Sequence, residues 1–294
     1  METDVIVIGC GPSGIQAAIH ASRRKASVIV VGKPSNSAIS GAELDNYFGT
    51  GKVSGDDILS LGISQAESTG AQFIHENVIS ASTDGSSFSF VLDSGTEVIA
   101  KSVVLAMGVS RHKLGVPGEN ELYGKGVSYC AVCDCNFYRG RRAVIVGNES
   151  EAAVSAELMT KYASETSWVV WEDCVNQRLY DAAVEAGVKV YRSKPVSIDG
   201  ESKVESITLE DGTSIPTDGV FIELGAKSAA DIAMDIGVMP EMDDSIKVSA
   251  GCSTEVAGVF ACGDIVGKPY QVAKAVGEGC VAGTSASVFV RESK

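Results

Sequence analysis

Short apolar runs alternate with small-residue and polar stretches along the chain. The apolar run at 4–8 leads into a glycine-rich turn and then into a stretch rich in Ala and Ile, which predicts a strand, a turn and a helix. A second apolar run follows at 28–32. We therefore expect a parallel strand–helix–strand unit at the N-terminus, because two parallel strands need a crossover between them.

The same order recurs in the middle of the chain. Residues 143–157, AVIVGNESEAAVSAE, again predict a strand, a turn and a helix, and the next apolar run is at 168–171. In each half, alternating apolar and polar residues around Asp-Gly or Ser-Gly turns then predict hairpin strands. The fold class is therefore α/β, with two Rossmann-like (three-layer ββα) domains of the dinucleotide-binding type.

The C-terminal stretch has no counterpart in the middle unit. It predicts one strand within 254–267 and a helix from about 269 to 289. These elements complete the first domain, so that the second is inserted within it. We expect residues 1–113 plus 243–294 to form the first domain and residues 114–242 the inserted one.

Length and charge exclude several classes of protein. The 294 residues are enough for two domains. The net charge of −14, from 38 acidic and 24 basic residues, argues against a nucleic-acid partner, which needs a basic surface. No apolar run reaches the roughly 20 residues of a membrane span, and no leader-like segment precedes the first strand. A cytoplasmic protein without a membrane partner is expected.

Three of the eight cysteines are clustered, at Cys130, Cys133 and Cys135. The other five lie in apolar or small-residue surroundings that are typical of a core, and in the cytoplasm most thiols stay reduced. Cys130 and Cys133 have the C-x-x-C spacing, which lowers the pKa of one thiol so that it can attack a disulfide. Asp134 follows directly and is placed to exchange protons with these thiols, whereas Cys135 is expected to be a bystander.

A zinc knuckle and a pair of inert thiols are the alternatives for this cluster. Zinc is disfavoured because the chain has no second C-x-x-C, and its three histidines, His20, His75 and His112, are not suitably placed. A redox pair and no metal site are therefore predicted.

Gly9, Gly11 and Gly14 form a G-x-G-x-x-G fingerprint between the first strand and helix. These glycines permit the tight turn, the approach of a pyrophosphate and the packing of helix on strand. The helix N-terminus then offers N–H groups to the phosphates. Gly32 and Lys33 follow the second strand where an acidic residue is usual, so the backbone of this glycine turn, or Lys33, would have to serve the ribose and adenine.

A second signal for the same ligand lies in GVFACGDIVG at 258–267. Asp264, next to Gly263, follows a buried strand and can face the ribityl chain of a flavin. The helix that follows points its N-terminus toward the flavin ring. A simple loop aspartate is the alternative.

Together these motifs resemble the low-molecular-weight, FAD-containing thioredoxin reductase family. The resemblance rests on GCGPSG, LDNYFG (44–49), VVLAMG, KLGVPGE, CAVCD followed by NFYRG, GVFACGD and PYQVAKAVGEG, which cover almost the whole chain. In that family the first domain holds FAD, and the inserted domain holds the C-x-x-C and NADPH. The resemblance also implies a homodimer.

The resemblance implies roles for individual residues. Cys133 would be the thiol next to the flavin, Cys130 the thiol that attacks thioredoxin, and Asp134 the acid–base residue. The residues that would line FAD are Gly9, Gly11, Pro12, Ser13, Gly14, Gly32, Lys33, Asn46, Ala106, Met107, Gly108, Gly263, Asp264, Tyr270, Gln271 and Val272.

The second glycine-rich turn departs from the family pattern. Members that use NADPH have another G-x-G-x-x-A/G there and a basic cluster after the next strand. Here Glu149 replaces the second glycine, and Glu172 and Asp173 occupy the basic positions. Losing two charge-assisted hydrogen bonds of about 1.5–3 kcal/mol each weakens binding by about two to four orders of magnitude. NADPH is therefore not expected as a cofactor.

One branch of the family, the ferredoxin-dependent flavin thioredoxin reductases, lacks NADPH motifs, and the chain resembles it in VFIELGAKSA at 220–229. Plant-type ferredoxin near about −400 mV can reduce thioredoxin near about −270 mV, downhill by about 6 kcal/mol for two electrons. The resemblance implies reduced ferredoxin as donor and thioredoxin as acceptor. The basic clusters at 23–25 and 139–142 are candidate docking sites for an acidic ferredoxin.

Other readings stay open. NADH or NADPH bound weakly and a deazaflavin are alternative donors. Electrons could also flow from small dithiols to oxygen, which would make the protein a dithiol oxidase. A flavin-bearing redox sensor without turnover is the alternative from outside the enzymes.

Overall fold

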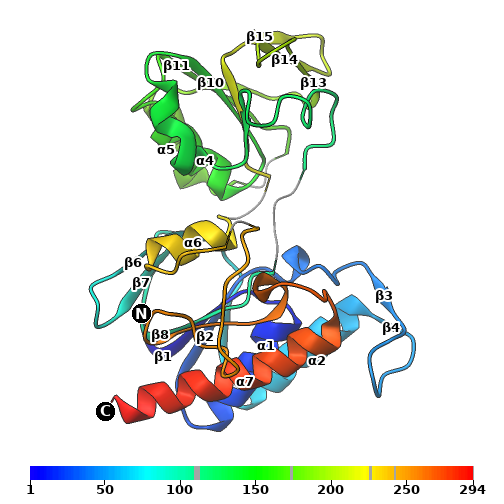
Figure 1. The fold of residues 1–294 in the computed structure, drawn as a ribbon, viewed down its shortest axis with the longest axis vertical. Coiled ribbons are helices and arrows are strands. Elements are labelled where there is room, and N and C mark those ends of the chain that lie inside the picture. Colours follow the sequence, from blue (N-terminus) through cyan, green and yellow to red (C-terminus); the bar gives the residue numbers. More distant parts are fainter. Residues whose placement is uncertain (109–112, 173–174, 225–226, 242, 294) are drawn as a thin grey trace. The chain divides into compact units, whose positions relative to one another are not determined.

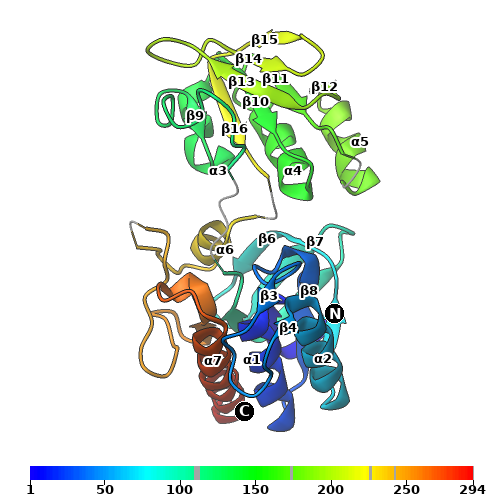
Figure 2. The same ribbon diagram turned by 90° about the vertical axis from the view of Figure 1, so that its right-hand side faces the viewer.

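The computed structural model describes residues 1–294 except 109–112, 173–174, 225–226, 242 and 294, and except the side chain of Cys133. The chain forms two compact units, one of Met1–Ser110 with Lys227–Lys294 and one of Arg111–Ala226. Each unit is built on a sheet that contains parallel strands, with helices packed against it (Figures 1 and 2). The predicted α/β class is confirmed.

The first unit has a seven-stranded sheet in the order β5-β2-β1-β8-β7-β6, with β17 paired to β8. Its strands are β1 (Glu2–Ile8), β2 (Val28–Val31), β5 (Gln72–Ile74), β6 (Val78–Thr83), β7 (Phe88–Leu92), β8 (Glu97–Leu105) and β17 (Val259–Ala261). The β1–β2, β1–β8, β2–β5 and β8–β17 pairs are parallel, whereas β6, β7 and β8 form antiparallel hairpins, as predicted. A short pair, β3 (Glu43–Leu44) with β4 (Val53–Ser54), lies outside this sheet.

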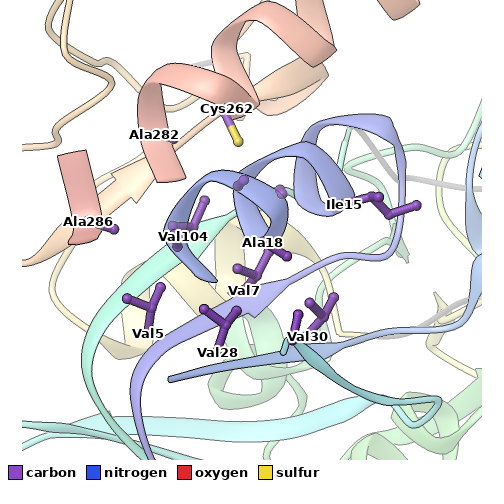
Figure 3. Packing of buried hydrophobic residues seen from close by; sticks show 14 of the residues in the cluster. Val5, Val7, Ile15, Ala18, Val28, Val30, Val104, Cys262, Ala282 and Ala286 are labelled. Carbon is purple, nitrogen blue, oxygen red and sulfur yellow. The ribbon is translucent and has the colours of Figure 1, made fainter. Parts of the chain in front are cut away.

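Helices α1 (Pro12–Arg23), α2 (Gly55–Ser68) and α7 (Val272–Glu292) lie along one face of the sheet (Figure 2). Successive side chains of a strand point to opposite faces. Val5 and Val7 of β1 therefore join the cluster beneath the helices, while Ile6 and Ile8 join the cluster on the other face. Figure 3 shows the helix-side cluster, in which small side chains of α1 and α7 pack over the valines of the strands.

Glycines bring α7 directly onto α1. A Cβ added at Gly279 would lie 2.2 Å from the carbonyl oxygen of Ser13, and one at Gly283 would lie 2.1 Å from that of Ala17. Real Cβ atoms do not approach a carbonyl oxygen so closely, so these two positions require glycine. Because Ser13 belongs to the glycine-rich turn, this packing also places the C-terminal helix beside the predicted flavin site.

The second boundary of the first unit differs from the expected one. Residues from Lys227 onward belong to the first unit, whereas the sequence placed the boundary at 242/243. The reason is the short helix α6 (Ala229–Asp235), whose apolar side chains join the second core cluster of the first unit. Asp235 also accepts a hydrogen bond from Ala81 N of β6 at 3.3 Å. The seven-residue helix had no strong periodic signal, so its packing partner was not evident from sequence.

The second unit has a five-stranded parallel sheet in the order β12-β11-β10-β16-β9. Its strands are β9 (Val127–Ser128), β10 (Arg142–Val146), β11 (Glu165–Val169), β12 (Lys189–Tyr191) and β16 (Gly219–Ile222), and its helices are α3 (Ala131–Asp134), α4 (Ser150–Met159) and α5 (Gln177–Glu185). An antiparallel sheet of β13 (Pro195–Asp199), β14 (Ser206–Leu209) and β15 (Ser214–Pro216) completes it. The order of elements repeats that of the first unit, as predicted.

Short 3-10 helices η1 (Pro34–Asn36), η2 (Cys135–Tyr138) and η3 (Gly263–Val266) occur in the connections. Throughout the described part of the chain, no helix is both long and apolar enough to cross a membrane.

Candidate active site

The turn between β1 and α1 uses its three glycines in different ways. A Cβ at Gly9, where φ is +117°, would lie 2.3 Å from the carbonyl oxygen of Ala106, and one at Gly14 would lie 2.0 Å from that of Gly9. Both glycines are therefore required for packing. Gly11 is different, because only the Ser37 hydroxyl of the described chain lies within 4 Å of an added Cβ, at 3.4 Å. This is the one glycine of the motif beside open space.

Gly11 is also the N-cap residue of α1, and Pro12 occupies the first turn. No side chain of the described residues caps this helix. Its first N–H groups and the positive end of its dipole are thus directed at the open side of the turn. A helix start of this kind is typical of turns that bind a pyrophosphate, and the dinucleotide at this turn stays a prediction.

The structure also brings together several of the other predicted FAD residues, which follow the ends of the strands. Asn46 Nδ2 donates a hydrogen bond to Gln271 Oε1 at 3.1 Å, although the two residues are far apart in sequence. A Cβ at Gly263 would lie 2.5 Å from Ser13 Oγ, so these two predicted residues are also adjacent.

The end of β8 and the end of β2 lie beside the same turn. A Cβ at Gly9 would be 3.0 Å from Met107 N, and one at Gly32 would be 3.0 Å from Cys10 N. Gly32 has a φ of +149°, which favours glycine. The remaining predicted positions follow these elements directly in the chain: Lys33 after β2, Gly108 after β8, and Tyr270 and Val272 at the start of α7.

Asp264 lies in η3, and burial raises the pKa of its carboxyl group, while Lys274 opposes the shift. The ammonium group of Lys274 donates to the carbonyl oxygens of Gly263 at 2.9 Å and Gly267 at 2.7 Å. Glu278 accepts from Gly263 N at 2.9 Å and pairs with Lys274 at 3.2 Å. Sequence reasoning missed this pair, for which the i, i+4 spacing of Lys274 and Glu278 on the last helix was the available signal.

The C-x-x-C lies on α3 of the second unit. Cys130 is 8% exposed and is disulfide-bonded. The side chain of Cys133 lies outside the described residues. Cys135, predicted to be a bystander, is buried and free, and its thiol faces the carbonyl oxygen of Val132 at 3.4 Å.

Ser128 connects Cys130 to Asp134. Its hydroxyl accepts a hydrogen bond from Cys130 N at 3.1 Å and donates one to Asp134 Oδ2 at 2.7 Å. Asp134 N in turn donates to the carbonyl oxygen of Cys130 at 3.3 Å. The carboxylate predicted to exchange protons is thereby held on the disulfide helix. No role was predicted for Ser128 from the sequence, because a serine two residues before a C-x-x-C carries no signal by itself.

Glu223 is a second residue that sequence reasoning missed. It follows β16, and its Oε1 accepts a hydrogen bond from Ala131 N at 2.9 Å. Ala131 lies between the two cysteines of the motif, so this carboxylate contacts the helix that carries the disulfide.

Hydrogen bonds show that the two glycine-rich turns are equivalent. Gly9 N donates to Val31 O at 2.8 Å in the first unit, and Gly147 N donates to Val169 O at 3.1 Å in the second. The residue after the neighbouring parallel strand matches as well, because Ala106 N donates to Ile8 O and Glu223 N to Val146 O, both at 2.8 Å. Ala106 and Glu223 thus hold the same place in the two units.

Three residues in or beside the glycine-rich turn of the first unit correspond to glutamates in the second unit. Glu149 stands in the place of Gly11, Glu151 in the place of Ser13, and Glu223 in the place of Ala106. Gly147 itself is retained for packing, since an added Cβ would lie 1.9 Å from Glu223 O.

The turn after β11 is occupied by internal hydrogen bonds. Asn148 Oδ1 accepts from Trp171 N at 2.9 Å and from Glu172 N at 3.2 Å. The buried indole of Trp168 donates to the carbonyl oxygen of Gly147 at 2.9 Å. Asp173, the other predicted acidic position, lies outside the described residues.

Among the residues that the structure describes, no group of three or more His, Cys, Asp or Glu side chains could hold a metal ion.

Residues 3–279 match the family model described as pyridine nucleotide-disulphide oxidoreductase. A thioredoxin reductase of Listeria innocua is 33% identical, over 99% of this chain and 95% of the relative. The crystal structure of an atypical thioredoxin reductase from Desulfovibrio vulgaris Hildenborough is similar with a TM-score of 0.83 and 31% identity, over 98% of each chain. That of a ferredoxin-flavin thioredoxin reductase from Clostridium acetobutylicum has a TM-score of 0.67 and 33% identity, over 99% of this chain and 98% of that chain. The chain therefore belongs to the pyridine nucleotide-disulphide oxidoreductase family, as a homologue of the thioredoxin reductases.

Proposed function

We propose that the protein is an FAD-containing thioredoxin reductase that takes its electrons from a donor other than NADPH, and that reduced ferredoxin is this donor. The observation that carries the proposal is the difference between two equivalent turns. The open turn at Gly11 suits a pyrophosphate, whereas its counterpart at Glu149 places a carboxylate where the phosphates would approach.

Bound FAD would supply the redox chemistry, since a flavin accepts single electrons and hands them on as a pair. In this proposal Gly11 and the N-terminus of α1 bind the pyrophosphate. Asp264 accepts hydrogen bonds from ligand hydroxyls, and Lys274 holds the loop that carries it. The other predicted FAD residues, including the hydrogen-bonded pair Asn46 and Gln271, surround the ligand from the ends of the strands and the start of α7.

Cys130 and Cys133 form the redox-active disulfide in this proposal. Two electrons and two protons convert it to a pair of thiols. The Cys130 thiolate then attacks the disulfide of thioredoxin, and Cys133 resolves the resulting mixed disulfide, which leaves thioredoxin reduced. Asp134 exchanges the protons with the leaving and attacking sulfur atoms, and Ser128 keeps its carboxylate on the helix.

Exposed apolar side chains lie on this helix and in the turn after it, and they support the docking of a protein substrate. Val132 is 48% exposed and Phe137 is 72% exposed. Aromatic and aliphatic side chains of this kind are typical anchors of protein interfaces.

Electrostatics argue against NADPH in the second unit. A pyrophosphate placed at this turn would meet the carboxylates of Glu149, Glu151 and Glu223 rather than open backbone. Like charges at close range disfavour binding, and the sequence that follows β11, WEDCVNQR at 171–178, has Arg178 as its one basic residue. The Clostridium acetobutylicum relative is named for ferredoxin, and the Desulfovibrio vulgaris relative is called atypical, which is consistent with a different donor.

The two basic clusters predicted to dock ferredoxin, at 23–25 and 139–142, differ in their location and in the contacts that their side chains already make. Arg23 and Lys25 are exposed at the C-terminal end of α1, whereas the pyrophosphate turn is at its N-terminal end, roughly 18 Å away at 1.5 Å per residue. In the other cluster, Arg142 pairs with Asp218 at 3.4 Å, and Arg139 stacks over Tyr162 at 5.0 Å. The homodimer and the cytoplasmic location stay predictions.

The test is an anaerobic reduction of the purified yellow protein in the presence of oxidised thioredoxin. One sample receives excess NADPH, a second NADH and a third chemically reduced ferredoxin. We expect only ferredoxin to bleach the flavin absorbance and to produce thioredoxin thiols. If NADPH bleaches the flavin within seconds, the donor part of the proposal is wrong and the protein is a pyridine-nucleotide thioredoxin reductase.

A further inference from the structure

The carboxylate of Glu223 is joined to the backbone beside the disulfide. Its Oε1 accepts the hydrogen bond of Ala131 N at 2.9 Å. Ala131 follows Cys130 in the chain, and both residues are buried, at 1% and 8% exposure. Because the contact is to a buried amide, it is protected from competition with water and fixes the first turn of α3.

A second side chain holds the neighbouring amide. Ser128 of β9 is paired in register with Phe221 of β16, two residues before Glu223. Cys130 N donates to Ser128 Oγ at 3.1 Å. Two successive amides of the disulfide segment are therefore bound by side chains from adjacent strands, and Figure 2 shows α3 beside β9 and β16.

The fold by itself does not require a carboxylate at this position. The equivalent residue of the first unit is Ala106, which makes the same backbone hydrogen bond to β1 that Glu223 makes to β10. The side chain of Glu223 instead reaches α3 and also lies 3.5 Å from the hydroxyl of Ser155, a buried residue of α4. The second unit differs from the first at this position because the side chain contacts the helix that carries the disulfide.

We propose that Glu223 is a positioning residue for the Cys130 disulfide, which anchors α3 and lowers the reduction potential of the disulfide through its negative charge. Reduction creates a thiolate in this segment, and a carboxylate close to it disfavours the thiolate. The disulfide is therefore stabilised relative to the reduced form, so the dithiol becomes the stronger reductant. Asp134, held on the same helix by Ser128, also carries a carboxylate and stays unchanged in the test. The proposal rests on the proposed function only in taking Cys130 as part of the redox-active disulfide.

The test compares Glu223→Gln, Glu223→Ala and Glu149→Gln in the full-length flavoprotein. Gln keeps an acceptor oxygen for Ala131 N but removes the charge, whereas Ala removes both. Glu149→Gln is the matched control, because it removes one carboxylate charge from the same nucleotide-type turn. Each protein is equilibrated anaerobically with mixtures of reduced and oxidised dithiothreitol, and alkylation followed by peptide mass analysis gives the fraction of Cys130 thiol. In this exchange, run at a pH above the pKa of the reactive thiol, dithiothreitol gives up two electrons and two protons and closes to its cyclic disulfide. The electrons break the Cys130 disulfide, one proton goes to one of its sulfur atoms and the other to solvent, which leaves one thiolate.

We expect the equilibrium constant for reduction to rise about tenfold in Glu223→Gln, as for a shift of one pKa unit, which corresponds to about 30 mV. Glu149→Gln should stay within about twofold of the original chain. Glu223→Ala should show at least the rise of the Gln variant and should also reduce thioredoxin more slowly, because α3 has lost an anchor. If the Ala variant fails to fold, the Gln variant alone decides.

An unchanged constant in Glu223→Gln would overturn the proposal. An equal rise in Glu149→Gln would also overturn it, since the total charge of the turn would then be responsible. A Cys130 disulfide that dithiothreitol cannot reduce would instead contradict the proposed function. Flavin reduction by NADPH would contradict only the proposed donor, because the dithiothreitol equilibrium of the Gln variant uses neither a donor protein nor thioredoxin.

Discussion

The hydroxyl of Ser128 donates a hydrogen bond to the carboxylate of Asp134 at 2.7 Å, and the same hydroxyl accepts from Cys130 N. One buried serine thus ties the predicted proton donor to the backbone of the predicted attacking cysteine. The position of the Asp134 carboxylate therefore depends on a residue outside the C-x-x-C-D motif.

Ser128→Ala should slow thioredoxin reduction about three- to tenfold, because Asp134 loses the contact that fixes its carboxylate on the disulfide helix. Stability should fall by about 1–3 kcal/mol, since the hydrogen bond is made to a charged group. Steady-state rates with the donor held constant and urea unfolding measure the two effects. Ser197→Ala is the matched control, because Ser197 makes a similar hydrogen bond to Asp199 at 2.9 Å in the antiparallel sheet of the same unit. A control that slows turnover as much as Ser128→Ala would contradict the assigned role.

Substitution of each cysteine should separate their proposed roles. Cys133→Ser should abolish turnover, keep the yellow colour and accumulate a mixed disulfide between Cys130 and thioredoxin, because the resolving thiol is gone. Cys130→Ser should trap no mixed disulfide. Non-reducing electrophoresis and mass analysis of the complex decide between them. Trapping by the Cys130→Ser variant instead would reverse the assignment of attacking and resolving thiols.

Removing acidic side chains from the second turn should improve the binding of NADPH. Glu149→Gly combined with Glu172→Arg removes two repulsive carboxylate charges and adds one charge-assisted hydrogen bond to a phosphate, which we expect to strengthen binding by at least tenfold. Titration with NADP⁺ by calorimetry measures the affinity. Glu149→Asp keeps the charge and should show no gain. Equal affinity of all three proteins would mean that these carboxylates do not exclude the nucleotide.

Two glycines of α7 should respond in opposite ways to the same substitution. Gly279→Ala should lower the free energy of unfolding by about 3 kcal/mol or more and weaken flavin retention, because the new Cβ meets the carbonyl oxygen of Ser13 at 2.2 Å. A Cβ at Gly277 meets no described atom within 4 Å, so Gly277→Ala should be neutral or stabilise the protein by up to about 1 kcal/mol through helix propensity. Urea unfolding measures both variants. Equal effects would contradict the close packing of α7 on α1.

The ionised side chain of Asp264 should lower the free energy of unfolding of the flavin-free protein. Burial raises the pKa of its carboxyl group, so its contribution is most favourable below the ordinary aspartate pKa of about 3.9 and is lost as the pH rises through the folded-state pKa. Asp264→Asn should therefore raise the melting temperature of the flavin-free protein at pH 7, with a smaller gain under acidic conditions. The same variant should retain less flavin. Thermal unfolding across a pH series decides, and a lower melting temperature at pH 7 would contradict the burial argument.

Local patterns determined much of this protein. The strand–turn–helix units at Gly9 and Gly147, the hairpins, the closing strand and helix, and the spacing of Cys130 and Cys133 are all properties of neighbouring residues. Periodicity and turn chemistry act over a few residues, so they can be recognised from the sequence without a structure. The replacement of a motif glycine by Glu149 was visible for the same reason.

The tertiary structure decided the contacts between distant segments. It packs α6 on the first unit rather than the second, joins Asn46 to Gln271, and brings Glu223 to the amide of Ala131. These relationships depend on strand register and on which helix face is buried, and neither is encoded in the spacing of any single segment. The motifs identified the chemistry, whereas the residues that hold that chemistry in place became evident only from the packed fold.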